Sequence, residues 1–126
     1  DVCSSDLYVL QDAPDAEAII IATGSEVGIA LKAAVALNNA GVATRVVSAP
    51  CLEWFDQQPA EYRESVLPSK ITNVVAIEAG STVGWFKYAK SVIGLDRFGA
   101  SGAPDLLYSE FGITADAVVS AVRANR

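Results

Sequence analysis

The chain has 126 residues, 52% of them hydrophobic and 19% charged, so it is long and apolar enough to bury the core of one domain. Its net charge of −6, with only 9 scattered basic residues, argues against nucleic acid as a partner, because such binding needs clustered Lys and Arg. Histidine, the commonest general base and metal ligand, is absent, and no apolar run approaches the roughly 20 residues that cross a bilayer. We therefore expect a cytoplasmic protein without nucleic-acid or membrane partners.

The first seven residues, DVCSSDL, resemble the in-frame translation of a common sequencing-adapter oligonucleotide. We therefore expect residues 1–7 to be a non-native leader and residues 8–126 to form the domain. The short apolar segment at residues 8–10 is then either an edge strand or an entry segment, and the polar turn that follows it contains Pro14.

The first strong strand signal is the run AIIIA at residues 18–22, which is apolar on both faces, as in a parallel sheet covered by helices on both sides. A helix is predicted at residues 26–39, with an apolar stripe at helical spacing and a stop at Asn38 to Gly41. Further strands are predicted at residues 42–47, 73–77 and 91–93, and further helices at 59–66, 85–90, 103–110 and from Thr114, a plausible cap. This alternation is typical of the α/β class: a doubly wound (Rossmann-like), mostly parallel sheet with helices on both faces, in a single domain.

In such a sheet the ligand crevice lies beyond the carboxyl ends of the strands. One candidate pocket therefore combines residues after the first and third predicted strands: Thr23, Gly24, Ser25, Glu26, Glu78 and Gly80. The glycine turn before a helix is able to cradle an anion, but it lacks the GxGxxG fingerprint, and an acidic residue at the helix start would repel a pyrophosphate. Plain helix capping is the leading interpretation of this turn, ahead of a vestigial, regulatory or small-anion site and of dinucleotide binding.

Glu26 and Glu78 are expected at the same edge, where two carboxylates are able to do acid–base work or hold a metal. A solvated or interface-facing pair is the more common arrangement, and we favour it. For the aromatic residues Trp85, Phe86 and Tyr88, an interface is the leading interpretation, ahead of packing in the core and of stacking on a ligand. The absence of histidine excludes a Ser–His–Asp or Cys–His arrangement. We assign no catalytic residue and no metal ligand.

Several strings of the sequence, in order, resemble the C-terminal domain of transketolase. They are IIIATGSEV, RVVSAPCLEWFDQQ, YRESVLP, VVAIEAGSTVGWFKY and IGLDRFGASGAPDLLYSEFGITADAVV, and together they cover essentially residues 8–126. The resemblance implies a homodimeric enzyme of three α/β domains that uses thiamine diphosphate and Mg²⁺ (or Ca²⁺). It also implies transfer of a two-carbon ketol unit from a ketose phosphate to an aldose phosphate, in the pentose phosphate pathway and the Calvin cycle.

In that family the N-terminal and middle domains bind the cofactor and the substrate, so the resemblance implies that this chain alone binds no cofactor and is inactive. Its own contribution is then structural, including support of the dimer. The alternative is a free-standing or split-gene α/β module that binds a small anionic metabolite at the carboxyl edge of the sheet. The first hypothesis predicts apolar surface that needs a partner domain, and the second predicts a ligand that raises the stability of the chain.

Overall fold

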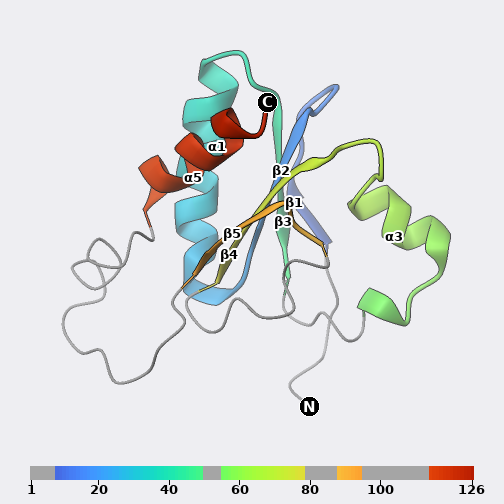
Figure 1. Cartoon of the computed structure of the whole chain (residues 1–126). Helices are drawn as coiled ribbons and strands as arrows, with labels where there is room; N and C mark the ends of the chain where they lie inside the picture. The colour runs from blue at the N-terminus through green and yellow to red at the C-terminus, as the bar shows by residue number, and fades with distance from the viewer. Residues whose placement is uncertain (1–7, 50–54, 79–87, 95–113) are drawn as a thin grey trace, which may run out of the picture.

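A computed structural model of the chain describes residues 8–49, 55–78, 88–94 and 114–126. Over these residues one sheet of five strands forms, in the order β1-β3-β2-β4-β5 (Figure 1). The strands are β1 (Tyr8–Gln11), β2 (Ala18–Ala22), β3 (Thr44–Ser48), β4 (Asn73–Glu78) and β5 (Ser91–Gly94). Only β1 runs antiparallel to its neighbour; β3, β2, β4 and β5 are parallel to one another. The predicted α/β class and mostly parallel sheet are therefore confirmed.

The central strand β2 owes its position to its sequence. All five of its residues are fully buried, and it pairs with β3 on one side and β4 on the other. Ile20 faces one hydrophobic cluster of the core, whereas Ile19 and Ile21 face the other. Because alternate residues point to opposite faces of a strand, only a strand that is apolar throughout suits this place. The bounds predicted for this strand are correct.

Two helices cover the Ile20 face of the sheet: α1 (Val27–Asn39) and α5 (Ala115–Ala124), which pack against each other (Figure 1). The predicted cap of α5 is confirmed, since Thr114 Oγ1 accepts a hydrogen bond from the Ala117 N–H at 3.1 Å. In the described part of the chain, no helix is long and apolar enough to span a membrane.

Helix α1 ends where the sequence predicts. Gly41 has a φ of +87°, in the left-handed region that favours glycine, and the Val42 N–H donates back to the Leu37 carbonyl at 2.9 Å. This return bond holds Val42 in the turn, so β3 begins at Thr44 and not at Val42 as predicted. Asn38 then ties the helix to the strand, because its Oδ1 accepts from the Thr44 N–H at 2.9 Å.

The other face of the sheet carries α3 (Ala60–Val66), whose Val66 packs on the Ile19 and Ile21 side of the core (Figure 1). The last four carbonyls of any α-helix lack partners within the helix. In α3 two of them, those of Ser65 and Val66, accept hydrogen bonds at 3.0 Å from Nη1 of Arg45, which lies on β3. Arg45 also pairs through Nε with Asp12 Oδ1 at 2.9 Å. One side chain therefore joins the turn after β1, strand β3 and the end of α3.

One predicted helix is wrong where the structure describes it. Residues 88–90 are not helical, because the Lys90 N–H donates to the Val74 carbonyl at 2.8 Å and so leads the chain into the β4–β5 ladder. Residues 85–87 and the helix predicted at 103–110 lie outside the described residues. The first helical residue of α3 is Ala60, and Pro59 takes the extended N-cap position before it.

Candidate functional site

The carboxyl ends of the parallel strands meet at one edge of the sheet, as expected. Ala22, the last residue of β2, is in register with Ile77 of β4 and Ser48 of β3. The backbones of Thr23 and Glu78 therefore leave this edge side by side. Gly80 and the side chains of Ser25 and Glu78 lie outside the described residues, so a pocket shared by Glu26 and Glu78 stays a prediction.

The turn after β2 is a short 3₁₀ helix, Gly24–Glu26, that leads directly into α1. Thr23 is still extended, with φ −122° and ψ 151°, and the Glu26 N–H donates to its carbonyl at 3.0 Å. Gly24 has a φ of +51°, and a Cβ built on it would meet no atom within 4 Å. The turn thus needs glycine for its backbone conformation and not for close approach of a neighbouring group.

Glu26 is the N-cap residue of α1 and is only 4% exposed, so the expectation that it is a solvated carboxylate is wrong. Neither its side chain nor that of Thr23 caps a helix, although both residues make other contacts within the chain. For these two side chains, helix capping is therefore the wrong interpretation. A buried carboxylate at the positive end of α1 already occupies the favourable field there and would repel a second anion. The geometry of this turn therefore disfavours an anion site.

The described residues do not fit a divalent metal either. Among them no group of three His, Cys, Asp or Glu residues is placed to hold a metal ion.

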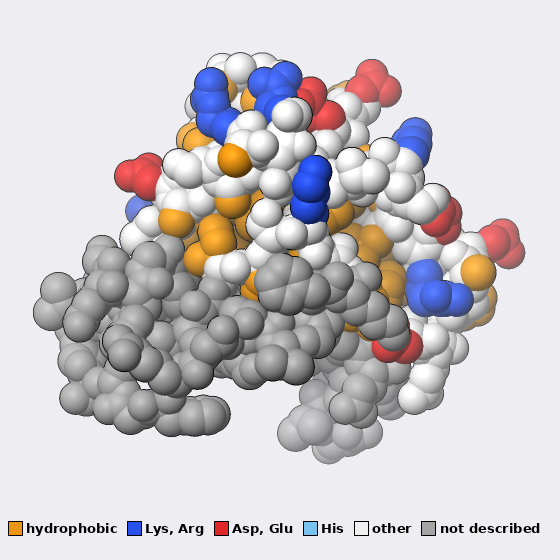
Figure 2. Space-filling view, viewed as in Figure 1, with side chains coloured by type: hydrophobic (Ala, Val, Ile, Leu, Met, Phe, Trp, Pro, Cys, Tyr) orange, Lys and Arg blue, Asp and Glu red, His pale blue; other side chains and the backbone are white. Residues whose placement is uncertain are grey.

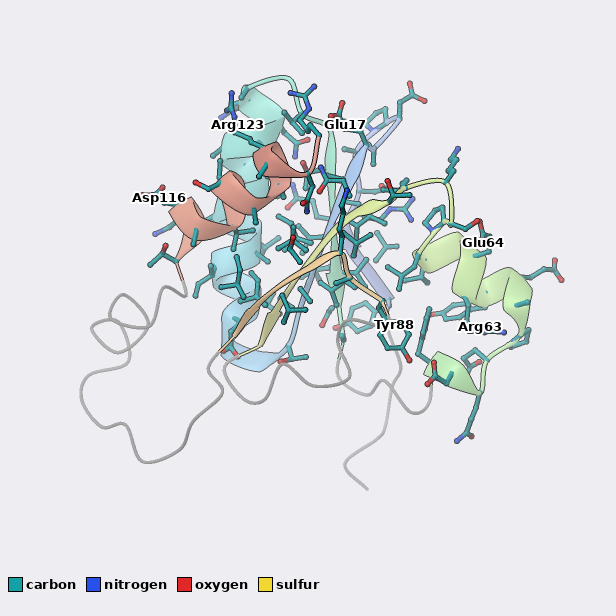
Figure 3. The ribbon with its side chains drawn as sticks, viewed as in Figure 1. Glu17, Arg63, Glu64, Tyr88, Asp116 and Arg123 are labelled. Carbon is teal, nitrogen blue, oxygen red and sulfur yellow. The ribbon has the colours of Figure 1, made fainter. Side chains whose placement is uncertain are left out.

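A cavity of about 760 Å³ lies elsewhere, on the α3 face of the sheet. We call it the α3 groove. Its walls are α3, the turn that follows α3, the start of β4 and the segment before β5 (Figure 3). Its polar lining includes Asp56, Arg63, Glu64, Ser69, Tyr88 and Lys90.

Sequence reasoning missed the α3 groove because its walls come from two separate stretches of the chain, residues 55–74 and 88–90. The adjacent Arg63 and Glu64 of α3 are a charge pattern that any solvated helix shows. Tyr88 was assigned to an interface, but in the described structure it packs edge-to-face on Phe55, with ring centroids 6.1 Å apart. Its hydroxyl donates to Asp56 Oδ1. Tyr88 therefore packs within the domain, and because it is half-buried its place in an interface stays a prediction; Trp85 and Phe86 lie outside the described residues.

Comparison with known proteins identifies the family. Residues 7–114 match the family model described as the transketolase-like TK C-terminal domain. The chain is 54% identical over 110 residues to the chloroplastic transketolase of Solanum tuberosum, covering 85% of this chain and 15% of that protein. Transketolase from Leishmania mexicana superposes with a TM-score of 0.88 at 45% identity, over 94% of this chain and 17% of that one.

A further solved structure, described as a split gene transketolase in an inactive β4 tetramer, has a TM-score of 0.64 at 28% identity. The match covers 94% of this chain and 41% of that one. The chain thus spans about a sixth of the length of the full transketolases it matches, but a larger part of the split-gene protein. Because the family model and these relatives agree over nearly all of the sequence, the chain belongs to the transketolase family, as its C-terminal domain.

Proposed function

We propose that this chain serves as the C-terminal domain of an enzyme that transfers a two-carbon ketol unit from a ketose phosphate to an aldose phosphate. The observation that carries the proposal is the 54% identity to a named transketolase, with 45% identity and a matching fold in a solved one. Because the chain covers only 15% of the first of these relatives, the activity belongs to the longer protein.

The contribution of the domain itself is structural. Its core is a sheet packed between helices, and its carboxyl edge holds a buried glutamate where an anion would have to bind. Thiamine diphosphate and Mg²⁺ (or Ca²⁺) are then held by the N-terminal and middle domains of the full enzyme, and those domains are the natural partners of this one. The relative described as an inactive β4 tetramer supports the proposal that a piece of the enzyme containing this fold does not work alone.

The assembly of the full enzyme is proposed to be a homodimer. The compartment stays a prediction: the sequence suggests the cytoplasm, but the potato relative is named as chloroplastic. The carboxyl-edge anion site of the alternative hypothesis receives no support from the described geometry.

The proposal is tested by assaying the purified chain with thiamine diphosphate, Mg²⁺, a ketose phosphate donor and an aldose phosphate acceptor. We expect no sugar-phosphate conversion above the enzyme-free blank, whereas a full-length transketolase under the same conditions converts its substrates. Conversion by the chain alone, reproducible across preparations and lost on heat denaturation, would show that the catalytic groups lie in this domain.

A further inference from the structure

The α3 groove combines an apolar floor with a charged rim. Leu67, Ile71 and Val74 line it together with Ala60 and Ala89, while Arg63, Glu64 and Lys90 supply charge. Figure 2 shows hydrophobic side chains reaching the surface of the molecule with charged groups of both signs around them. A volume of about 760 Å³ falls within the range of sites that take small molecules.

The two carboxylates of the groove already have hydrogen-bond donors within the chain. Glu64 Oε2 accepts from the backbone N–H of Ser69 at 2.9 Å and from its hydroxyl at 3.0 Å. Asp56 accepts from the hydroxyl of Tyr88. Both acidic groups are therefore held in place by neighbours, and neither needs a ligand to complete its hydrogen bonds.

The two cations of the groove, Arg63 and Lys90, in contrast keep hydrogen-bond donors that no described residue uses. Over the described residues, the Lys90 ammonium makes no hydrogen bond and no ion pair. Among the described residues, the Arg63 side chain donates only through Nε, to the Gln58 carbonyl at 3.1 Å, so its two terminal nitrogens have no acceptor there. Figure 3 shows Arg63 below α3 and Tyr88 nearer the sheet, at the segment before β5. A guanidinium with free terminal nitrogens matches a carboxylate in shape and charge.

We propose that the α3 groove binds a small organic monocarboxylate, with its carboxylate toward Arg63 and Lys90 and its apolar body on the floor formed by Leu67, Ile71 and Val74. Arg63 and Lys90 attract one carboxylate, and a second negative charge on the ligand would meet repulsion from Asp56 and Glu64. The floor selects for an apolar body, which a free inorganic anion lacks. None of the residues that line the α3 groove belongs to the carboxyl-edge turn, so the proposed site is separate from the candidate pocket at that turn.

Titration of the ¹⁵N-labelled chain with benzoate, monitored by amide chemical shifts, tests this site. Benzamide is the neutral control of the same shape, and inorganic phosphate is the anion without an apolar body. We expect saturable benzoate shifts on the groove residues with a Kd on the order of 1 mM, and weaker binding of benzamide and phosphate. Equal binding of benzoate and benzamide, phosphate binding as tight as that of benzoate, or no saturation by about 50 mM benzoate would each overturn the proposal.

Substitutions of the two cationic side chains test whether they bind the carboxylate of benzoate. Lys90→Gln and Arg63→Gln should each weaken benzoate binding about two- to fivefold, the range of a solvent-exposed ion pair, and leave benzamide unchanged. Because the Lys90 ammonium has no partner among the described residues, its replacement should not affect folding. Lys32→Gln, which makes the same change on α1 at the other face of the sheet, is the matched control and should leave the Kd unchanged. Loss of affinity in the control equal to that in Lys90→Gln would refute the site.

Discussion

Replacing Arg45 should cost much more stability than replacing its ion-pair partner Asp12. Arg45 Nη1 donates to the carbonyls of Ser65 and Val66, two of the groups that α3 leaves unpaired at its end. Each lost bond from a charged donor at this partly buried place is worth about 1 kcal/mol, so Arg45→Met should lower the free energy of unfolding by about 2 kcal/mol. The side chain of Asp12 is 54% exposed, so Asp12→Asn should cost only about 0.5 kcal/mol.

Urea denaturation of both variants measures the difference, with Arg123→Met, an exposed site on α5, as the control for loss of a surface guanidinium. The control should stay within about 0.5 kcal/mol of the parent chain. If Asp12→Asn lowers the free energy of unfolding as much as Arg45→Met does, Arg45 stabilises the fold through its ion pair with Asp12 and not through the end of α3. That result would refute the reasoning.

The same pair makes a small part of the stability depend on pH. The hydrogen bond from Arg45 holds the pKa of Asp12 below its ordinary value. The folded form therefore favours the carboxylate, and this contribution is present above the unfolded pKa of about 3.9 and is lost as the pH falls through the lower folded pKa. The difference in free energy of unfolding between the parent and Asp12→Asn should accordingly shrink below about pH 4, as measured by urea denaturation at several pH values. A difference that grows as the pH falls would contradict the direction of the shift.

Three further substitutions test the core and the helix ends by the same denaturation assay. Ile20→Ala, at the fully buried centre of the sheet, should lower the free energy of unfolding by about 4 kcal/mol. Val35→Ala, at a side chain 52% exposed on α1, should lower it by less than about 1 kcal/mol. Similar losses in the two variants would contradict the assigned core. Asn73→Ala removes a buried donor, 2.8 Å from the Val122 carbonyl near the end of α5, and should cost about 2 kcal/mol; a neutral effect would show that this bond contributes nothing. Thr114→Ala should cost about 1 kcal/mol and Thr114→Ser much less, because serine keeps the capping oxygen; equal losses would exclude the cap as the cause.

The features of the fold that could be predicted from the sequence are those that a local pattern of residues determines. The apolar run at residues 18–22 fits only a strand buried on both faces, and it became the centre of the sheet. Gly41 and Thr114 act through their own backbone and hydroxyl, so the end of α1 and the start of α5 were visible in the sequence. The edge strand at residues 8–11 was one of two alternatives, because whether so short a segment pairs depends on the neighbour it meets.

Contacts between distant segments could not be predicted in this way. Nothing near Arg45 in the sequence indicates that its guanidinium reaches the end of a helix 20 residues later. The helix predicted at residues 85–90 fails at its described end because a β-ladder bond to Val74 outweighs the local preference. The burial of Glu26, in the turn after β2, could not be predicted either. It depends on the packing of distant segments around this residue and not on its neighbours in the sequence.

Domain replacement tests most directly the claim that this chain is the C-terminal domain of a transketolase with its catalytic groups elsewhere. Residues 8–126 are fused in place of the matching segment of the potato relative, which the chain matches at 54% identity, and ketol transfer is measured with thiamine diphosphate and Mg²⁺. The same fusion carrying Ile20→Ala controls for folding of the grafted domain. We expect kcat within about tenfold of the parent enzyme, which corresponds to an activation barrier raised by less than about 1.4 kcal/mol. A well-folded chimera that binds cofactor but has no activity would show that this domain supplies something specific to catalysis, and would contradict the structural role assigned to it.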